Sequence, residues 1–188
     1  MISDGREALL ELARVAVYRA AGALGTVEVL HHAVFDRRAG AFVTLHVSGA
    51  LRGCVGTPGA DGTLGQIVTH CAAAAAREDP RFRPLQAVDL VRLSIEVSVL
   101  SPLVRCAGPE GIVIGRHGLI VEQKGRRGLL LPQVAAARGW SPVMFLEHTC
   151  VKAGLAADAW RGGAVIHRFE ADVFGDREGP RSPGARTL

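Results

Sequence analysis

Four stretches of the chain read as helices. In residues 4–21 apolar side chains recur at intervals of three and four, the spacing of one helix face. A second helix is predicted from residue 62 or 63 to residue 77, because it contains five consecutive alanines, the strongest helix former. A short helix is expected at 132–139, where a proline begins it, and a longer one at 141–153, where Ser-Pro begins it and a glycine follows.

Other stretches alternate between apolar and polar side chains, as half-buried strands do. The clearest covers residues 92–100, in which Ser94, Glu96 and Ser98 stand between leucine, isoleucine and valine. Further strands are predicted at 42–47, 51–56, 112–114, 119–122, 129–131 and 164–174. Because strands and helices are mixed and hairpins join the strands, the sequence predicts an α+β fold with a mostly antiparallel sheet flanked by helices.

The first predicted hairpin carries the most informative residues. Strand alternation puts the apolar residues at 51 and 55 on the core side, and Arg52 and Cys54 on the other. Matching the faces then pairs Val47 with Leu51, His46 with Arg52 and Thr44 with Cys54. This register requires a three-residue loop at 48–50, whereas a tighter Ser-Gly turn would slip the pairing by one residue. We expect the burial pattern to decide, which leaves His46 diagonal to Cys54.

Cys54 admits two interpretations. A guanidinium close to a thiol favours the thiolate, so Arg52 on the same strand face would make Cys54 reactive. Free cysteine is also among the most buried residue types, and on the residues alone the plainer reading is that Cys54 is a small inert residue under a covering helix. Cys71 and Cys150 lie on predicted helices and are expected in the core.

Three charged residues are further candidates. Glu96 is either a buried carboxylate that needs a partner or a solvated one, depending on whether its strand face is covered. Asp79 and Arg81, in an Asp-Pro-Arg-Phe sequence, could lie at the rim of a cleft. The plainer reading is a helix stop with a local ion pair.

Composition narrows the class of protein. The 188 residues are 48% hydrophobic and 21% charged, as in ordinary globular proteins, and a net charge of +4 is too small to indicate nucleic-acid binding. The basic turn at 115–127 is read as wet surface, and RNA binding there is the weakest option. No apolar run is long enough for a membrane span and no signal peptide is seen, so the expected location is cytoplasmic.

Metal and cofactor motifs are also missing from the sequence. None of the four cysteines forms a Cys-x-x-Cys pair, so no structural zinc site is expected. No glycine loop for a dinucleotide or a nucleoside triphosphate occurs, nor a Gly-x-Ser-x-Gly turn, so no cofactor is expected.

Residues 51–57 read Leu-Arg-Gly-Cys-Val-Gly-Thr, which resembles the signature of the AMMECR domain family, whose prokaryotic members are called AmmeMemoRadiSam system protein A. Val55 stands where isoleucine is usual. Further similar blocks follow in order at 41–45, 79–85, 95–102, 118–119, 130–135 and 152–155. The resemblance covers about residues 5–175, so we expect one AMMECR-type domain at 1–175 and a disordered tail at 176–188.

The resemblance implies a cytosolic α+β fold with a larger body and a small appended lobe. It also implies association with a Memo-like protein and a radical S-adenosylmethionine (SAM) enzyme. It brings no established reaction. Carried over position by position, it makes Arg52 and Cys54 the leading site residues, with Glu96, Asp79 and Arg81 as companions.

Two functions follow from these residues. In the first, the chain is an accessory or adaptor component in which Gly53 and Gly56 permit close backbone approach and Arg52 anchors a carboxylate or phosphate. Its expected binding positions are Gly53, Gly56, Thr57, His46, Asp79 and Arg81. In the alternative, the chain is a thiol-dependent enzyme or group carrier. Cys54 is then the nucleophile, Arg52 activates it and Glu96 serves as acid or base.

Overall fold

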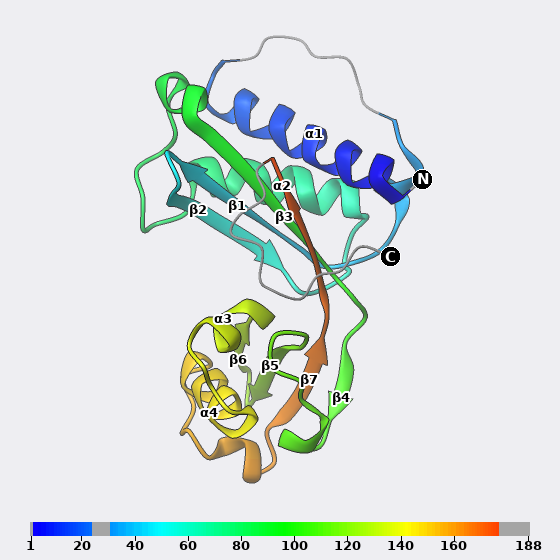
Figure 1. Ribbon diagram of the computed structural model, residues 1–188, viewed down its shortest axis with the longest axis vertical. Coiled ribbons are helices and arrows are strands. Elements are labelled where there is room, and N and C mark those ends of the chain that lie inside the picture. Colours follow the sequence, from blue (N-terminus) through cyan, green and yellow to red (C-terminus); the bar gives the residue numbers. More distant parts are fainter. Residues whose placement is uncertain (1, 24–30, 177–188) are drawn as a thin grey trace. The chain divides into compact units, whose positions relative to one another are not determined.

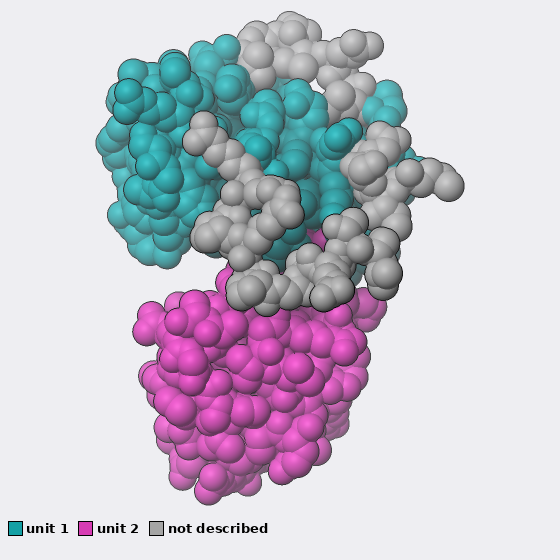
Figure 2. Space-filling model, viewed as in Figure 1, with its two compact units in different colours: residues 1–99, 173–188 teal, residues 100–172 magenta. Residues whose placement is uncertain are grey.

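The computed structural model describes residues 2–23 and 31–176. The chain forms two compact units, shown in Figures 1 and 2. Unit 1 comprises residues 1–99 and 173–188, and unit 2 comprises residues 100–172. Unit 2 is therefore an insertion between two segments of unit 1. Each unit has a four-stranded sheet and its own apolar core.

Unit 1 is built on a sheet with the strand order β2-β1-β3-β8, called sheet A. Its strands are β1 (Ala41–Val47), β2 (Ala50–Thr57), β3 (Leu93–Leu100) and β8 (Ala171–Gly175). Helices α1 (Ile2–Ala20) and α2 (Leu64–Arg77) pack together over one face of this sheet (Figure 1). Two short 3-10 helices, η1 (Ala33–Asp36) and η2 (Ala87–Arg92), complete the unit.

Unit 2 is built on a second sheet with the strand order β4-β7-β5-β6. Its strands are β4 (Val104–Cys106), β5 (Gly118–Gln123), β6 (Arg126–Leu130) and β7 (Val165–Phe169). Helices α3 (Pro132–Ala137) and α4 (Pro142–Lys152) and the 3-10 helices η3 (Pro109–Gly111) and η4 (Ala159–Arg161) accompany it. Phe145 and Leu146 of α4 are fully buried against the apolar side chains of β5.

The predicted α+β class is confirmed, with antiparallel pairing throughout β1, β2 and β3. The predicted start of α2 is also correct, because Thr63 and Gln66 form a reciprocal capping box there. The predicted strand at 112–114 is wrong. The N–H groups of Arg116 and His117 both donate to the carbonyl of Val113, at 3.2 and 2.9 Å, so this stretch closes turns instead of a sheet ladder. Strand β4 was not predicted.

The single last strand predicted at 164–174 is two strands in two different sheets. The break falls at Glu170, whose N–H donates to Ser101 Oγ and whose carbonyl accepts from Ser101 N–H, each at 2.9 Å. Of the predicted tail, only Asp176 lies within the described residues. Its carboxylate accepts the N–H of Ile95 at 3.1 Å and pairs with Arg14 of α1.

The hairpin of β1 and β2 has both the tight Ser-Gly turn and the pairing of Thr44 with Cys54, which the sequence analysis treated as alternatives. Ser48 and Gly49 both have positive φ, 52° and 82°, which is the two-residue turn that suits a twisted hairpin. Val47 therefore pairs with Ala50, and His46 with Leu51, so the predicted three-residue loop and the pairing of His46 with Arg52 are wrong. A β-bulge at Arg52 then restores the register, and Thr44 lies opposite Cys54 as predicted.

The bulge also changes which residues face the core. Because Arg52 is an extra residue in the ladder, strand alternation is broken between Leu51 and Gly53. Leu51 is opposite His46 and 41% exposed, which corrects its assignment to the core. Val55, opposite Val43, packs against the core as expected.

Candidate functional site

Three side chains form a row across the middle of sheet A. Thr44 of β1 is the partner of Cys54 on one side and of Glu96 on the other. Val43 and Leu45, which flank Thr44 in β1, are fully buried in the core under the helices. Strand alternation therefore puts the row on the opposite face, here called the open face. Cys54 and Glu96 are two strand spacings apart, about 10 Å, so they do not contact each other directly.

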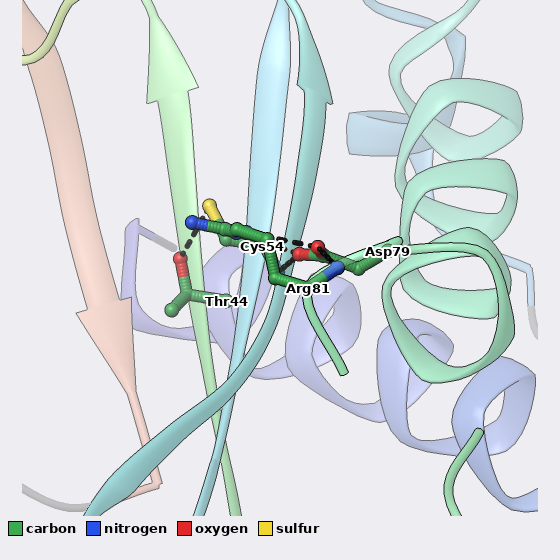
Figure 3. Close-up of polar contacts among 4 residues, drawn as sticks. All are labelled: Thr44, Cys54, Asp79 and Arg81. Atoms are coloured by element: carbon green, nitrogen blue, oxygen red, sulfur yellow. Dashed lines mark hydrogen bonds and ion pairs between the residues drawn. The ribbon is translucent and has the colours of Figure 1, made fainter. Parts of the chain in front are cut away.

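The Cys54 sulfur lies within reach of a hydroxyl group. Thr44 Oγ1 donates a hydrogen bond to Cys54 Sγ at 3.4 Å (Figure 3). Cys54 is half-buried, whereas Cys71, Cys106 and Cys150 are all buried. Burial raises the pKa of the Cys71 thiol to about 11. Of the four cysteines, Cys54 is therefore the one that a molecule outside the chain can reach.

The backbone of Cys54 is held by a buried carboxylate. β2 is an edge strand, and the outward N–H of Cys54 donates to Asp79 Oδ2 at 2.9 Å. Asp79 is 6% exposed and also accepts Nε and Nη2 of Arg81, at 2.9 and 2.6 Å, and the Arg81 N–H at 3.1 Å. The Arg81 guanidinium is the main cause that lowers the pKa of Asp79 well below its usual range, and the Cys54 N–H adds to the effect. Asp79 thus joins the strand that carries the thiol to the segment that follows α2.

Asp79 and Arg81 form the local ion pair expected after the end of α2. The pair also lies beside the candidate thiol (Figure 3). The hydrogen bond to Asp79 is the largest cause that raises the pKa of Arg81. Arg81 is therefore held as a cation beside the strand that carries Cys54.

Arg52 lies along the strand edge. Its guanidinium is 5.8 Å from the centre of the Phe82 ring, and its Nη2 is 3.5 Å from the carbonyl oxygen of Pro84. The Arg81 guanidinium approaches the same ring to 5.2 Å. The contacts of Arg52 are thus with the segment after α2, whereas those of the Cys54 sulfur are with Thr44. The sequence argument placed Arg52 beside the sulfur, and the structure gives Arg81 the closer link, through Asp79.

The two glycines of the 51–57 stretch are explained by contacts within the chain. A Cβ at Gly53 would lie 2.1 Å from the carbonyl oxygen of Ala75 in α2. A Cβ at Gly56 would lie 2.2 Å from the ring of Phe42, its partner across the sheet. Both positions therefore need glycine without any bound molecule.

The remaining predicted residues have separate places. Thr57 ends β2, and its hydroxyl accepts the N–H of Gly59 at 3.3 Å. His46 is half-buried and pairs with Leu51 and Ser94, so it shares a sheet face with Thr44. Sequence reasoning left Thr44 out of the site, although the predicted register put it opposite Cys54. It also left out Phe82, although Phe82 ends the Asp-Pro-Arg-Phe sequence that supplied Asp79 and Arg81.

The described residues, 2–23 and 31–176, contain neither a candidate metal site nor a helix that could span a membrane. No three of their histidine, cysteine, aspartate and glutamate side chains are grouped so as to hold a metal ion. None of their helices has the length and apolar character that a membrane span requires.

Comparison with known proteins places the chain in a family. The model of the AMMECR1 family matches residues 10–174. A protein of Methanosarcina acetivorans is 44% identical over 150 residues, covering 77% of this chain and 75% of that protein. A protein of Aquifex aeolicus is 39% identical over 152 residues, covering 77% and 78%.

A solved structure has the same fold. The crystal structure of an uncharacterized protein from Pyrococcus horikoshii superposes with a TM-score of 0.82 at 37% identity, covering 93% of this chain and 92% of that one. The family model spans both units, as well as the row of Thr44, Cys54 and Glu96. The resemblance read from residues 51–57 is therefore confirmed, and the chain belongs to the AMMECR1 family.

Proposed function

We propose that this protein is an accessory, adaptor-type component of a system that includes a Memo-like protein and a radical SAM enzyme. It meets its partner through the open face around Cys54. The observation that carries the proposal is the way Cys54 is fixed. Its sulfur accepts a hydrogen bond from Thr44, and its backbone N–H donates to the Asp79–Arg81 pair.

This arrangement favours a binding role for Cys54 over one in which a neighbouring group removes the proton of its thiol. The Thr44 hydroxyl is a donor to the sulfur, and a hydroxyl is far too weak a base to remove the proton of a thiol. The carboxylate nearest along the row, Glu96, is about 10 Å away by strand spacing. The described contacts therefore fix the position of Cys54 and leave its sulfur and its row neighbours to face a partner.

The test is retention of the two partners on the tagged protein. The Memo-like protein and the radical SAM enzyme of the same organism are expected to co-purify with the wild-type chain. Glu96→Lys puts a charge of opposite sign in the middle of the open face, and we expect retention to fall at least about tenfold, because like or unpaired charges in an interface are costly. Glu110→Lys makes the same charge change at an exposed position in unit 2 and serves as the control. Failure of the wild-type chain to retain either partner, or equal retention by Glu96→Lys, contradicts the proposal.

The second candidate is a thiol-dependent enzyme or group carrier with Cys54 as nucleophile. The hydrogen bond from Thr44 favours it, because a donor to sulfur stabilises the thiolate. The spacing between Cys54 and Glu96 would accommodate a small substrate, on which the carboxylate acts as acid or base.

This alternative predicts a covalent adduct. Wild-type protein incubated with the low-molecular-weight fraction of a cell extract would gain mass at Cys54, and Cys54→Ser would not. An unchanged mass in the wild-type protein, together with retention of both partners, decides for the adaptor.

A further inference from the structure

We propose that the edge of β2 beside Cys54 is an oxyanion-binding site. In this site Arg52 and Arg81, both set against Phe82, select ligands that carry a carboxylate or phosphate group. The inference rests on the proposed function in taking the surroundings of Cys54 as the binding surface. It adds the chemical class of what is bound there.

The first observation is the course of the chain after α2. Asp79 contacts Cys54, and Pro84 contacts Arg52, so the segment 79–84 runs along the free edge of β2 in the opposite direction. This course brings Arg81 and Phe82 to the same edge as Arg52. The Phe82 ring, 5.8 and 5.2 Å from the two guanidinium groups, restrains both of them by cation–π contact.

The second observation is the balance of charge. Arg83 is neutralised by Asp89 through two hydrogen bonds of 3.0 and 2.9 Å. Asp79 is likewise occupied by Arg81. Arg52 forms no ion pair with a carboxylate among the described residues, and its hydrogen bond is to a carbonyl oxygen. Its charge adds to the hydrogen bonds from Arg83 and Gln86 that lower the pKa of Asp89, so Asp89 is shared between two arginines. Three guanidinium groups at this edge therefore face two carboxylates, which leaves one positive charge in excess within the part of the chain that the structure describes.

The third observation is the supply of free donors. A guanidinium has five N–H donors, and Arg81 directs those of Nε and one of Nη2 to Asp79. Its side chain is 55% exposed, so Nη1 can donate outwards. Asp79 Oδ2 accepts from both Arg81 Nη2 and the Cys54 N–H. The Arg81 guanidinium and the Cys54 backbone thus bind the same carboxylate oxygen. An anion bound to the Arg81 guanidinium therefore lies next to Cys54.

The test uses two alkylating reagents of nearly equal size. Iodoacetate is an anion and iodoacetamide is neutral. With each, the sulfur displaces iodide, a C–S bond forms, the C–I bond breaks and the thiol proton goes to solvent. The other three cysteines are buried, so mass spectrometry of the native protein reads the rate at Cys54. The rate ratio of iodoacetate to iodoacetamide is expected to be about fivefold higher than for N-acetylcysteine, the size of one exposed charge contact, and to fall as salt is added.

Arg52→Gln should lower the ratio towards that of N-acetylcysteine, because only Arg81, which is already paired with Asp79, is left to attract the anion. Because this variant leaves the Asp79–Arg81 pair intact, a change in the rate ratio is not explained by loss of folding. Arg19→Gln, which removes an exposed arginine from the last turn of α1, is the matched control and should keep the wild-type ratio. Inorganic phosphate and acetate, tested separately as competitors, assign the bound group to the phosphate or the carboxylate class.

A ratio equal to that of N-acetylcysteine, or one unchanged in Arg52→Gln, overturns the inference, and the partner-retention result stands regardless. If instead the ratio is raised but neither partner is retained, the oxyanion site stands and the adaptor role is rejected.

Discussion

Position 53 has room for a hydrogen atom and nothing larger. The obstacle to a Cβ is the carbonyl oxygen of Ala75, which belongs to the backbone of α2 and cannot turn aside as a side chain would. The close approach of helix and strand at Gly53 fixes the face of β2 that points away from the helix, and with it the direction of the Cys54 side chain.

We therefore expect Gly53→Ala to lower the free energy of unfolding by about 3 kcal/mol or more, since overpacking a tight contact costs about 1–3 kcal/mol and here backbone must shift. Urea unfolding followed by circular dichroism measures the change. Gly162→Ala is the control, because its Cβ would meet nothing closer than 3.6 Å. Equal stability of Gly53→Ala and the wild-type protein would show that the helix and strand separate at no cost.

Asp79 makes the free energy of unfolding depend on pH in the acid range. Its pKa is lowered in the folded state, chiefly by Arg81. Its contribution to stability is therefore complete above the unfolded pKa, about 3.9, and is lost as the pH falls through the lower folded value. Because Arg81 is 55% exposed, solvent weakens the ion pair, and much of the contribution comes from the two backbone N–H groups that Asp79 accepts.

Asp79→Ala is expected to cost about 1–3 kcal/mol at neutral pH, the usual penalty for leaving buried donors unpaired. The difference from wild type should shrink as the pH falls below about 4, because Asp79 of the unfolded chain then binds a proton that the folded chain, with its lowered pKa, does not yet bind. Unfolding midpoints at several pH values check this. A difference independent of pH would mean that the charge of Asp79 has no part in it.

The β1–β2 hairpin depends on the backbone conformation of one residue, Ser48. Its turn requires positive φ at Ser48, a conformation that costs most L-residues about 1–2 kcal/mol and asparagine less. Lys124 in the β5–β6 turn has the same geometry, with φ 50° before Gly125.

Ser48→Asn and Lys124→Asn should each raise the free energy of unfolding of their own unit by about 0.5 kcal/mol, because Asn-Gly is the favoured pair in such turns. Each variant is the control for the other, since the two turns lie in different units. Thermal unfolding of both variants tests the expectation, which a lowered midpoint in either would refute.

The bulge of β2 shows where sequence reasoning reached its limit. Alternating burial predicted that Thr44 lies opposite Cys54, and turn preference predicted a two-residue loop. The two seemed exclusive because a regular ladder has no extra residue. The chain satisfies both by leaving Arg52 unpaired, which no period-two pattern can reveal.

The edge of the site was predicted only in part. The resemblance named Asp79 and Arg81 as companions of Cys54, but residues 79–84 form an irregular segment, and only regular elements leave a periodic signal that could place them. The motif at 51–57 located the thiol correctly on the open face. The partner of its backbone, some 25 residues further along the chain, had to be seen in three dimensions.

At the scale of the whole molecule, the two units can be followed by different probes. Both tryptophans, Trp140 and Trp160, lie in unit 2, whereas Cys54 lies in unit 1. Unit 2 also holds His117, a 6% exposed imidazole whose Nδ1 accepts the N–H of Val113 at 2.9 Å. Burial is the main cause that lowers the pKa of His117, and the charges of Arg168 and Arg116 add to it.

A histidine with a lowered folded pKa binds its proton more readily when unfolded. The free energy of unfolding is therefore unaffected by His117 above the pKa of histidine in the unfolded chain, about 6.5, and it decreases as the pH falls below that value. We expect the urea midpoint of unit 2, followed by tryptophan fluorescence, to decrease as the pH is lowered below about 6.5. His117→Gln should reduce the dependence. An unchanged dependence in His117→Gln would assign the effect elsewhere.

The threading of the chain has a consequence for biosynthesis. β8 completes sheet A beside β3, yet residues 101–170 are translated between those two strands. While a ribosome makes this protein, the helices and first three strands of unit 1 emerge early and wait for their fourth strand until all of unit 2 has been produced. The β3 edge is exposed throughout that interval, so a nascent chain arrested before residue 171 presents an unpaired strand to chaperones and to its neighbours.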